Sequence, residues 1–360
     1  MPSTSEPQVL IEHAGALGRI RLNRPKALNS LTLRMVREIG KALDTFEADP
    51  AVATVLISGE GERGLCAGGD IRMIYESGKA GSQEPIDFWR EEYRLNARLN
   101  RFPKPLVAFM DGIVMGGGVG VCVYASHRIV TERTRLAMPE AGIGFFPDVG
   151  ASWFLTRQNN ELGTYAALTG AALAAGDAIA LGLADSYVPS GRLAELAEAL
   201  TRLPGGRAAL PALIAAFAAP PPPAEVAARQ APIDRLFAFD TVEEIFTALE
   251  RDGSLFAQET LAVLKAKSPL TLKVTLRLLR LGRRETALEA CLEREFAATA
   301  AVLRSPDFYE GVRAAVIDKD RNPQWRPARL EAVAAGNVAA FFEPSAEPLF
   351  AGDAAKGEPT

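Results

Sequence analysis

The stretch KPLVAFMDGIVMGGGVG, residues 104–120, decides the fold class. It begins with a short apolar run, which is typical of a buried strand, and ends in glycines that open a predicted helix. Glycine directly after a strand lets the backbone turn sharply and lets a ligand approach its N–H groups. A strand, a glycine turn and a helix in this order indicate an α/β unit with a turn open to a ligand.

The same alternation extends outward from this stretch. The pattern predicts two strands around a glycine turn in residues 9–23, a helix in 30–50, and further strands in 52–59 and 127–132. Strands thus alternate with helices over residues 1–190, which predicts an α/β core. Residues 191–345 are rich in Ala, Leu and Arg and predict helices that cover the core or form oligomer contacts, and 346–360 predict a flexible tail.

Composition restricts the classes of partner. The chain has 360 residues and a net charge of −4, without a long Lys or Arg run, which argues against nucleic acid. Its apolar runs are too short to span a membrane, and its acidic N-terminal stretch lacks the features of a signal or transit peptide. The three cysteines have no metal-ligand spacing, so we expect reduced thiols and a cytoplasmic protein without a metal or redox cofactor.

The candidate chemistry therefore rests on carboxylates and backbone amides. Only His13 and His127 are present, and no nucleophile elbow, phosphate loop or dinucleotide fingerprint occurs. Two carboxylates, Glu140 and Asp148, lie in the apolar, glycine-dotted segment RLAMPEAGIGFFPDVGASWFL, residues 135–155. Acids in such surroundings are usually paired or functional, although both residues could simply stabilise turns.

Two glycine clusters accompany these acids. GLCAGGDIRMI, residues 64–74, and the glycines of 116–120 each follow a predicted strand and precede a predicted helix. Two such turns facing each other could present two N–H donors to one oxygen, as an oxyanion hole does. Tight packing loops remain the alternative, because glycine-rich motifs are weak signals alone.

Four segments together carry a family resemblance. LNRPKALNSL (22–31), GLCAGGDIR (64–72), KPLVAFMDGIVMGGGVG (104–120) and AMPEAGIGFFPDVG (137–150) resemble, in this order, the crotonase or enoyl-CoA hydratase/isomerase superfamily. The resemblance implies a spiral of ββα units and an acyl-CoA substrate, with CoA as part of the substrate rather than a cofactor. It also implies a possible homo-oligomer, a trimer in many members.

The resemblance also assigns site residues. The amides of Gly69 and Gly117 would hold the thioester oxygen. The CoA moiety would lie near two groups of residues: Lys26, Ala27 and Leu28, and Ala67, Asp70 and Ile71.

One departure from the family pattern bears on the branch. Hydratases of this family use two glutamates; the second matches Glu140, but the first falls on Gly120, which has no side chain. The chain resembles instead a branch of the family that hydrolyses 3-hydroxyisobutyryl-CoA in valine catabolism. The parts that carry this resemblance are Asp148, Glu92 and the segments 268–277 and 305–327. In that reading Glu140 attacks the thioester or activates water, Asp148 orients it, and Glu92 accepts the substrate hydroxyl.

Other readings stay open at this point. Hydration or isomerisation of another acyl-CoA is one alternative, and an inactive binding protein of the same fold is another. Glu92 lies on a charged helix, where a solvated glutamate is common, and Asp148 follows a proline in a turn-like sequence.

Overall fold

The computed structural model describes residues 6–203 and 206–351, which form two compact units. We call them the sheet unit and the helical unit. The sheet unit takes in residues up to Asp70, Arg98–Ala137 and Ala172–Ala228; the helical unit takes in Ile71–Ala97, Met138–Ala171 and the chain from Arg229. Each unit is assembled from separate stretches, whereas the sequence predicted domains in chain order, with boundaries after 190 and 345.

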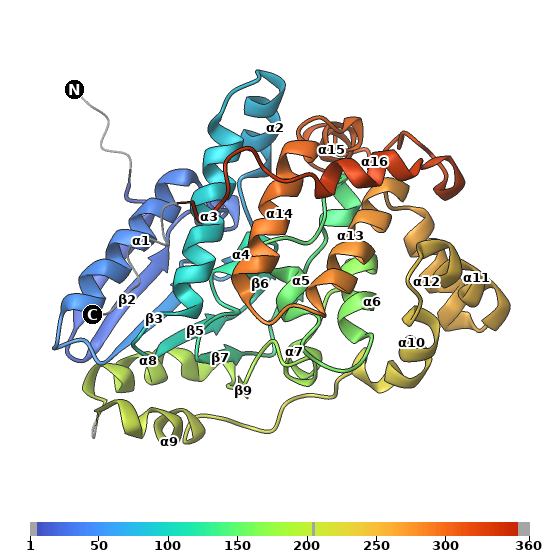
Figure 1. The fold of residues 1–360 in the computed structure, drawn as a ribbon. Coiled ribbons are helices and arrows are strands. Elements are labelled where there is room, and N and C mark those ends of the chain that lie inside the picture. The colour runs from blue at the N-terminus through green and yellow to red at the C-terminus, as the bar shows by residue number, and fades with distance from the viewer. Residues whose placement is uncertain (1–5, 204–205, 352–360) are drawn as a thin grey trace. The chain divides into compact units, whose positions relative to one another are not determined.

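The strands of the described residues lie in the sheet unit (Figure 1). A six-stranded sheet has the order β1-β2-β3-β5-β7-β9, in which only β1 and β2 pair antiparallel, and a three-stranded parallel sheet has the order β4-β6-β8. The strands are β1 Val9–Ala14, β2 Leu17–Leu22, β3 Thr54–Gly59, β4 Gly64–Cys66, β5 Leu106–Met110, β6 Ile113–Met115, β7 His127–Val130, β8 Arg135–Ala137 and β9 Ser186–Tyr187.

The apolar run that opens the 104–120 stretch differs from the prediction of one strand. It forms β5 and β6, which belong to different sheets. The chain bends between them at Gly112, whose φ is +66° and whose missing Cβ would lie 2.7 Å from the Arg63 carbonyl oxygen. Only glycine fits this corner, and the corner passes the chain from the larger sheet to the smaller one.

Helices cover both faces of the larger sheet. Leu17 belongs to the core cluster with Leu193 and Leu196 of α8, whereas its neighbour Gly18 lies against the Phe46 ring of α1. Successive strand residues face opposite sides, so α8 and α1 pack on opposite faces. The helices that lie wholly in the sheet unit are α1 Leu33–Ala48, α4 Gly117–Gly120, α7 Ala175–Ala180, α8 Leu193–Arg202 and α9 Leu210–Ala215.

The helical unit confirms the predicted helical C-terminal region. One of its longest helices is α13, which follows Ser268 and ends at Gly282. The Ser268 side chain caps this helix by accepting a hydrogen bond from the Thr271 amide. The helices are α2 Ile71–Lys79, α3 Glu84–Asn100, which ends in the sheet unit, α5 Ala151–Phe154, α6 Leu162–Thr169, α10 Gln230–Phe237, α11 Val242–Asp252, α12 Leu255–Lys265, α13 Pro269–Gly282, α14 Leu288–Val302, α15 Pro306–Val312 and α16 Ala335–Ala339.

The end of the described chain is anchored. Leu349 is buried, its carbonyl accepts a 2.8 Å hydrogen bond from Arg94 Nε, and its amide donates one of 2.8 Å to Glu293. The flexible tail predicted from residue 346 therefore needs correction for 346–351, because a buried leucine and two hydrogen bonds fix this segment. Residues 352–360 lie outside the described residues.

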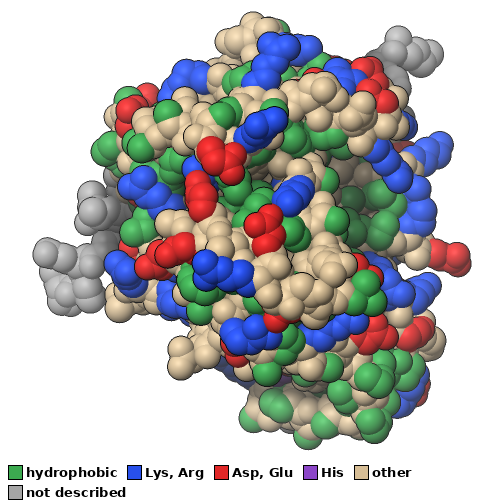
Figure 2. Space-filling model, turned by 90° about the vertical axis from the view of Figure 1, so that its right-hand side faces the viewer, with side chains coloured by type: hydrophobic (Ala, Val, Ile, Leu, Met, Phe, Trp, Pro, Cys, Tyr) green, Lys and Arg blue, Asp and Glu red, His purple; other side chains and the backbone are tan. Residues whose placement is uncertain are grey.

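The surface carries charges of both signs. On the face shown in Figure 2, Lys and Arg side chains are interspersed with Asp and Glu side chains. Within residues 6–203 and 206–351, no helix combines the length and apolarity that crossing a membrane requires.

Candidate active site

The two predicted glycine turns lie against each other in the sheet unit. A Cβ on Gly118 would lie 2.3 Å from the Cys66 carbonyl oxygen, so α4 packs directly on the end of β4. A Cβ on Gly68 would lie 3.4 Å from the Gly117 nitrogen. The residue preceding Gly69 therefore contacts the turn that carries Gly117, and the structure brings the two predicted donors together.

Both predicted amide donors are available to a ligand. The Leu31 amide donates to the Gly68 carbonyl at 2.8 Å and the Asp70 amide to the Leu31 carbonyl at 2.9 Å, a parallel bridge that turns the Gly69 N–H away from Leu31. Gly117 is the first residue of α4, where an amide has no acceptor within the helix. Among the described residues, neither N–H donates a hydrogen bond. This geometry suits a pair of donors to one oxygen.

The predicted CoA-binding residues of the sheet unit also converge. Lys26 and Ala27 are exposed on a short 3-10 turn, Pro25–Ala27, and the Ala67 amide donates a 3.0 Å hydrogen bond to the Leu28 carbonyl. The Asp70 carboxylate accepts a 2.9 Å hydrogen bond from the Arg24 guanidinium. Ile71, the remaining predicted residue, begins α2 in the helical unit.

The helical unit holds the three predicted carboxylates in its interior. Glu92 lies on α3, Glu140 begins the 3-10 turn Glu140–Ile143, and Asp148 precedes α5; their exposed fractions are 2%, 6% and 5%. Glu92 Oε1 and Glu140 Oε2 are buried without a hydrogen-bond partner in the described part of the chain. Unpaired buried carboxylate oxygens are costly, so these atoms are candidates for contact with a ligand.

The electrostatics of the three groups agree with a functional site. Burial, and then the neighbouring Asp148, raise the pKa of Glu140 well above its usual value. Burial, Asp148 and Glu140 raise the pKa of Glu92 in the same way. Burial raises the pKa of Asp148 to about 7, against the opposing effect of its hydrogen bond with Tyr93. The cluster therefore favours retaining protons near neutral pH, and strongly perturbed acids of this kind are common at catalytic sites.

Aromatic side chains supply much of this low-polarity environment. Phe145 stacks on Trp89 of α3 with ring centroids 5.5 Å apart and on Phe146 at 4.6 Å. These rings lie in the segment between Glu140 and Asp148 and one helical turn before Glu92, so they remove water from around the acids. Exclusion of water strengthens every charge interaction in the cluster.

Two side chains of the cluster were not predicted from the sequence. The Tyr93 hydroxyl donates a 2.7 Å hydrogen bond to Asp148 Oδ2. Lys267 interacts electrostatically with Glu140 and lowers its pKa, and its ammonium lies close to Gly142. Tyr93 follows Glu92 directly in the sequence, which was a usable signal. Lys267 offered none, because it precedes an ordinary Ser-Pro helix start.

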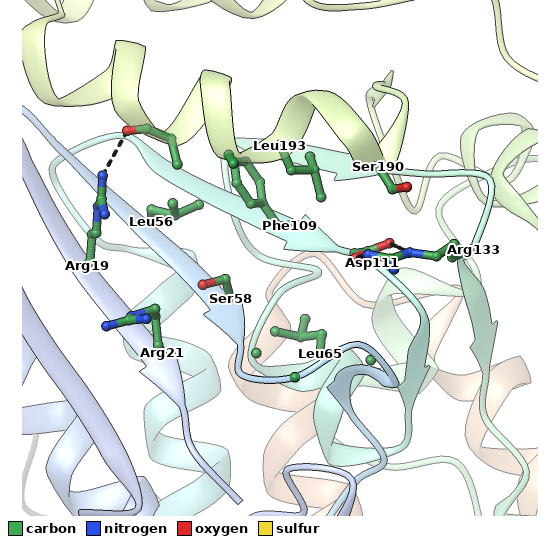
Figure 3. Close-up of a pocket in the computed structure, with 15 residues that line it drawn as sticks. Arg19, Arg21, Leu56, Ser58, Leu65, Phe109, Asp111, Arg133, Ser190 and Leu193 are labelled. Atoms are coloured by element: carbon green, nitrogen blue, oxygen red, sulfur yellow. Dashed lines mark hydrogen bonds and ion pairs between the residues drawn. The ribbon is translucent and has the colours of Figure 1, made fainter. Parts of the chain in front are cut away.

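A separate cavity of about 380 Å³ lies in the sheet unit (Figure 3). Leu56, Phe109 and Leu193 form its apolar lining, Arg133 is paired with Asp111, and Arg19 donates to the Ala197 carbonyl at 3.2 Å. The residues that line it include none of the predicted site residues. We therefore assign none of the candidate chemistry to this cavity.

Comparisons with known proteins agree on one family. A profile of the enoyl-CoA hydratase/isomerase family matches residues 17–342. The mitochondrial 3-hydroxyisobutyryl-CoA hydrolase of Xenopus laevis is 42% identical over 339 residues, which cover 92% of this chain and 88% of that protein. The human protein of the same description is 42% identical, over 91% of this chain and 86% of its own length.

Solved structures support the same fold. A structure described as a carnitinyl-CoA dehydratase from Mycobacterium thermoresistibile has a TM-score of 0.91 and 44% identity, and the match covers 96% of this chain and 100% of that one. A structure described as an enoyl-CoA hydratase from Rhodobacter sphaeroides has a TM-score of 0.85 and 42% identity, and the match covers 94% of this chain and 98% of that one. The predicted α/β fold, a crotonase-like spiral with a helical C-terminal region, is confirmed.

Proposed function

Because the chain belongs to the enoyl-CoA hydratase/isomerase family, we propose that it hydrolyses a short 3-hydroxyacyl-CoA thioester. The favoured substrate is 3-hydroxyisobutyryl-CoA, cleaved to 3-hydroxyisobutyrate and CoA as a step of valine catabolism. The observation that carries this proposal is the buried group of Glu92, Glu140 and Asp148, in which Glu92 Oε1 and Glu140 Oε2 have no partner among the described residues. The relatives from Xenopus laevis and human are described as 3-hydroxyisobutyryl-CoA hydrolases, which supports the proposal.

The proposed reaction begins at the thioester carbonyl. The amides of Gly69 and Gly117 donate to its oxygen, and Glu140 attacks the carbonyl carbon to give a tetrahedral oxyanion. Each donor contributes about 3 kcal/mol to stabilising such a charge. Collapse breaks the C–S bond, the departing sulfur takes the proton held by the carboxyl pair, and a mixed anhydride with Glu140 remains. Water then cleaves the anhydride, which restores Glu140 and releases the acid.

Asp148 supports this sequence by holding or receiving the proton. Its raised pKa, about 7, and the raised pKa of Glu140, both caused first by burial, favour a pair that shares one proton at neutral pH. One member is then ionised to attack while the other retains a proton for the leaving group. A general-base role, in which Glu140 activates water directly, uses the same two groups and is the second form of the mechanism.

Glu92 is proposed to select the acyl group. Its Oε1 atom is buried without a partner among the described residues, so a hydroxyl on the substrate would satisfy it. A site that buries such an acceptor discriminates against acyl groups that lack the hydroxyl. This is the specificity expected for a 3-hydroxyacyl thioester.

Hydration or double-bond isomerisation is the second candidate, because the two solved structures are described as a dehydratase and a hydratase. Gly120 argues against hydration. It lies buried in α4 at the position where the family resemblance places the first hydratase glutamate, and it has no side chain to move a proton. Losing one positioned acid or base lowers the rate about 10²–10⁴-fold.

The deciding experiment is CoA release from four thioesters: 3-hydroxyisobutyryl-, 3-hydroxypropionyl-, isobutyryl- and crotonyl-CoA. A thiol reagent such as DTNB measures free CoA, and enoyl absorbance follows crotonyl-CoA in parallel. We expect rapid release from the two 3-hydroxyacyl thioesters. Loss of enoyl absorbance without thiol release would favour the hydratase instead, and no change with any thioester would favour a binding protein.

Three accompanying proposals concern cofactor, assembly and location. We propose that the enzyme uses no metal or redox cofactor, with CoA supplied by the substrate; addition of a chelator should leave turnover unchanged. A homo-oligomer remains a proposal that light scattering tests. The cytoplasmic location also remains a prediction, since the curated relatives are described as mitochondrial.

A further inference from the structure

A fourth buried carboxylate lies behind the Asp148 turn. Glu295 on α14 is fully buried and accepts three hydrogen bonds: from the Gly150 amide at 2.6 Å, from the Ser152 amide at 2.9 Å and from the Ser152 hydroxyl at 2.5 Å. Both carboxylate oxygens are used, each by a backbone N–H. No step of the proposed reaction uses this group.

The turn that Glu295 holds is strained. Val149 has a φ of +53°, a conformation that a β-branched residue adopts only when its surroundings impose it. The Ala151 amide donates to the Asp148 carbonyl at 2.9 Å, so Asp148, Val149 and the start of α5 form one rigid turn. The Glu295 carboxylate ties the far side of this turn, at Gly150 and Ser152, to α14.

The same helix supports the other side of Asp148. The Phe296 ring packs edge-on against Tyr93, with centroids 6.3 Å apart, and Tyr93 donates its hydroxyl proton to Asp148 Oδ2. Two consecutive residues of α14 therefore contact the two structures that orient the Asp148 carboxylate, its turn and its hydrogen-bond donor.

We infer that Glu295 is a positioning residue for Asp148: its carboxylate holds the strained Val149–Gly150 turn and so fixes the Asp148 side chain for proton transfer. This inference rests on the proposed function, because it assigns a role in that reaction. Displacing a reacting group by about 1 Å can cost 10²-fold in rate. Releasing the turn should therefore lower turnover without a matching loss of substrate binding.

Asp148 and Glu295 also interact through charge. The titratable groups that face the Asp148 region are Glu92 and Tyr93 from α3, Glu140 from its 3-10 turn, Lys267 beside Glu140, and Cys291 and Glu295 from α14. Burial raises the pKa of Glu295 to about 8, its three donors oppose this shift, and Asp148 raises it further. Because the pKa of Asp148, about 7, is the lower of the two, Asp148 ionises first, and its negative charge makes ionisation of Glu295 harder.

The test compares Glu295→Gln with two other variants, using 3-hydroxyisobutyryl-CoA as substrate. Glu161→Gln is the matched control: Glu161 is a buried carboxylate of the same unit, but it is bonded to Arg280 and Arg283. Ser152→Ala removes one of the three hydrogen bonds to Glu295 and keeps its carboxyl group. For each variant, kcat and KM are measured from pH 5.5 to 9, together with the melting temperature.

We expect Glu295→Gln to lower kcat about 10- to 100-fold with KM changed less than about threefold. Glu161→Gln should lower the melting temperature alone. If Glu295→Gln behaves like this control, Glu295 has only a structural role and the inference is wrong.

Two further outcomes need separate treatment: a Glu295→Gln variant that does not fold, and a wild-type protein that releases no CoA. If Glu295→Gln does not fold, Ser152→Ala decides: a fall in kcat of about three- to tenfold at constant KM supports the inference, and unchanged kcat overturns it. If the wild-type protein releases no CoA from any thioester, the proposed function is wrong. Normal wild-type turnover with an unaffected Glu295→Gln variant contradicts only the positioning role.

Discussion

The Tyr93 hydroxyl donates a 2.7 Å hydrogen bond to Asp148 Oδ2, and both groups are buried. The bond stabilises the ionised form of Asp148 and thus opposes the effect of burial on its pKa. A residue of α3 therefore tunes an acid 55 positions later in the chain.

Tyr93→Phe removes this donor and keeps the ring. We expect the alkaline limb of kcat/KM to move to higher pH, because Asp148 holds the proton for the leaving group and its pKa rises when its ionised form loses a hydrogen bond. Tyr165→Phe, which alters a half-buried tyrosine of α6, is the control and should leave the limb in place. A limb that stays fixed in Tyr93→Phe would show that Asp148 does not govern it.

Glu140→Gln keeps the shape of the side chain and removes the nucleophile or base. We expect kcat to fall at least about 10²–10⁴-fold, while the dissociation constant for CoA, measured by calorimetry, changes little. The amide nitrogen cannot attack or accept a proton as the carboxylate does. Near-normal thiol release from this variant would sink the proposed mechanism.

Glu92→Gln should weaken selection for the hydroxyl more than turnover itself. We expect the ratio of kcat/KM for 3-hydroxyisobutyryl-CoA over isobutyryl-CoA to fall about tenfold or more, since an amide is a weaker acceptor and cannot carry charge. Glu91→Gln, on the adjacent position of α3, serves as the control. An unchanged ratio would assign hydroxyl recognition to another group.

Asp148→Asn should flatten the dependence of stability on pH. In the wild-type protein the folded state keeps a proton on Asp148 up to a pKa of about 7, whereas the unfolded chain releases it near its ordinary value. The folded state thus binds more protons, so the unfolding free energy falls as pH rises through this window. In urea titrations, the unfolding free energy of Asp148→Asn should fall by about 1–2 kcal/mol less than that of the wild type between pH 5 and pH 7. A slope equal to that of the wild type would contradict the raised pKa.

Gly118→Ala should distort the glycine turn 116–120, which carries the predicted amide donor Gly117. Its Cβ would lie 2.3 Å from the Cys66 carbonyl oxygen, so the segment that leads to Gly69 must shift. We expect a loss of about 1–3 kcal/mol in unfolding free energy and a fall in kcat. Gly40→Ala is the control, because its Cβ on α1 meets no atom within 4 Å, and it should keep full activity. Equal activity in the two variants would show that catalysis does not depend on the geometry of this turn.

Local patterns were sufficient to predict the parts of the site that lie close together in the chain. Glu140 and Asp148 stand in one short apolar segment, and the glycines of 64–74 and 116–120 mark their own turns. The same patterns missed the break between β5 and β6, because an apolar run does not show which residue turns the chain. They also placed residues 346–351 in a tail, because nothing near Leu349 reveals the buried site that holds it.

By itself, the sequence determined the alternation of strands and helices, the glycine turns and the identity of the candidate acids, because each depends on residues that are neighbours in the chain. Only the tertiary structure decided the environment of those acids. Tyr93, Lys267 and Glu295 act on Glu140 or Asp148 from elements far away in the sequence. The pKa of a carboxyl group depends on burial and on charges within a few ångströms, and it is folding, not sequence order, that brings those groups together.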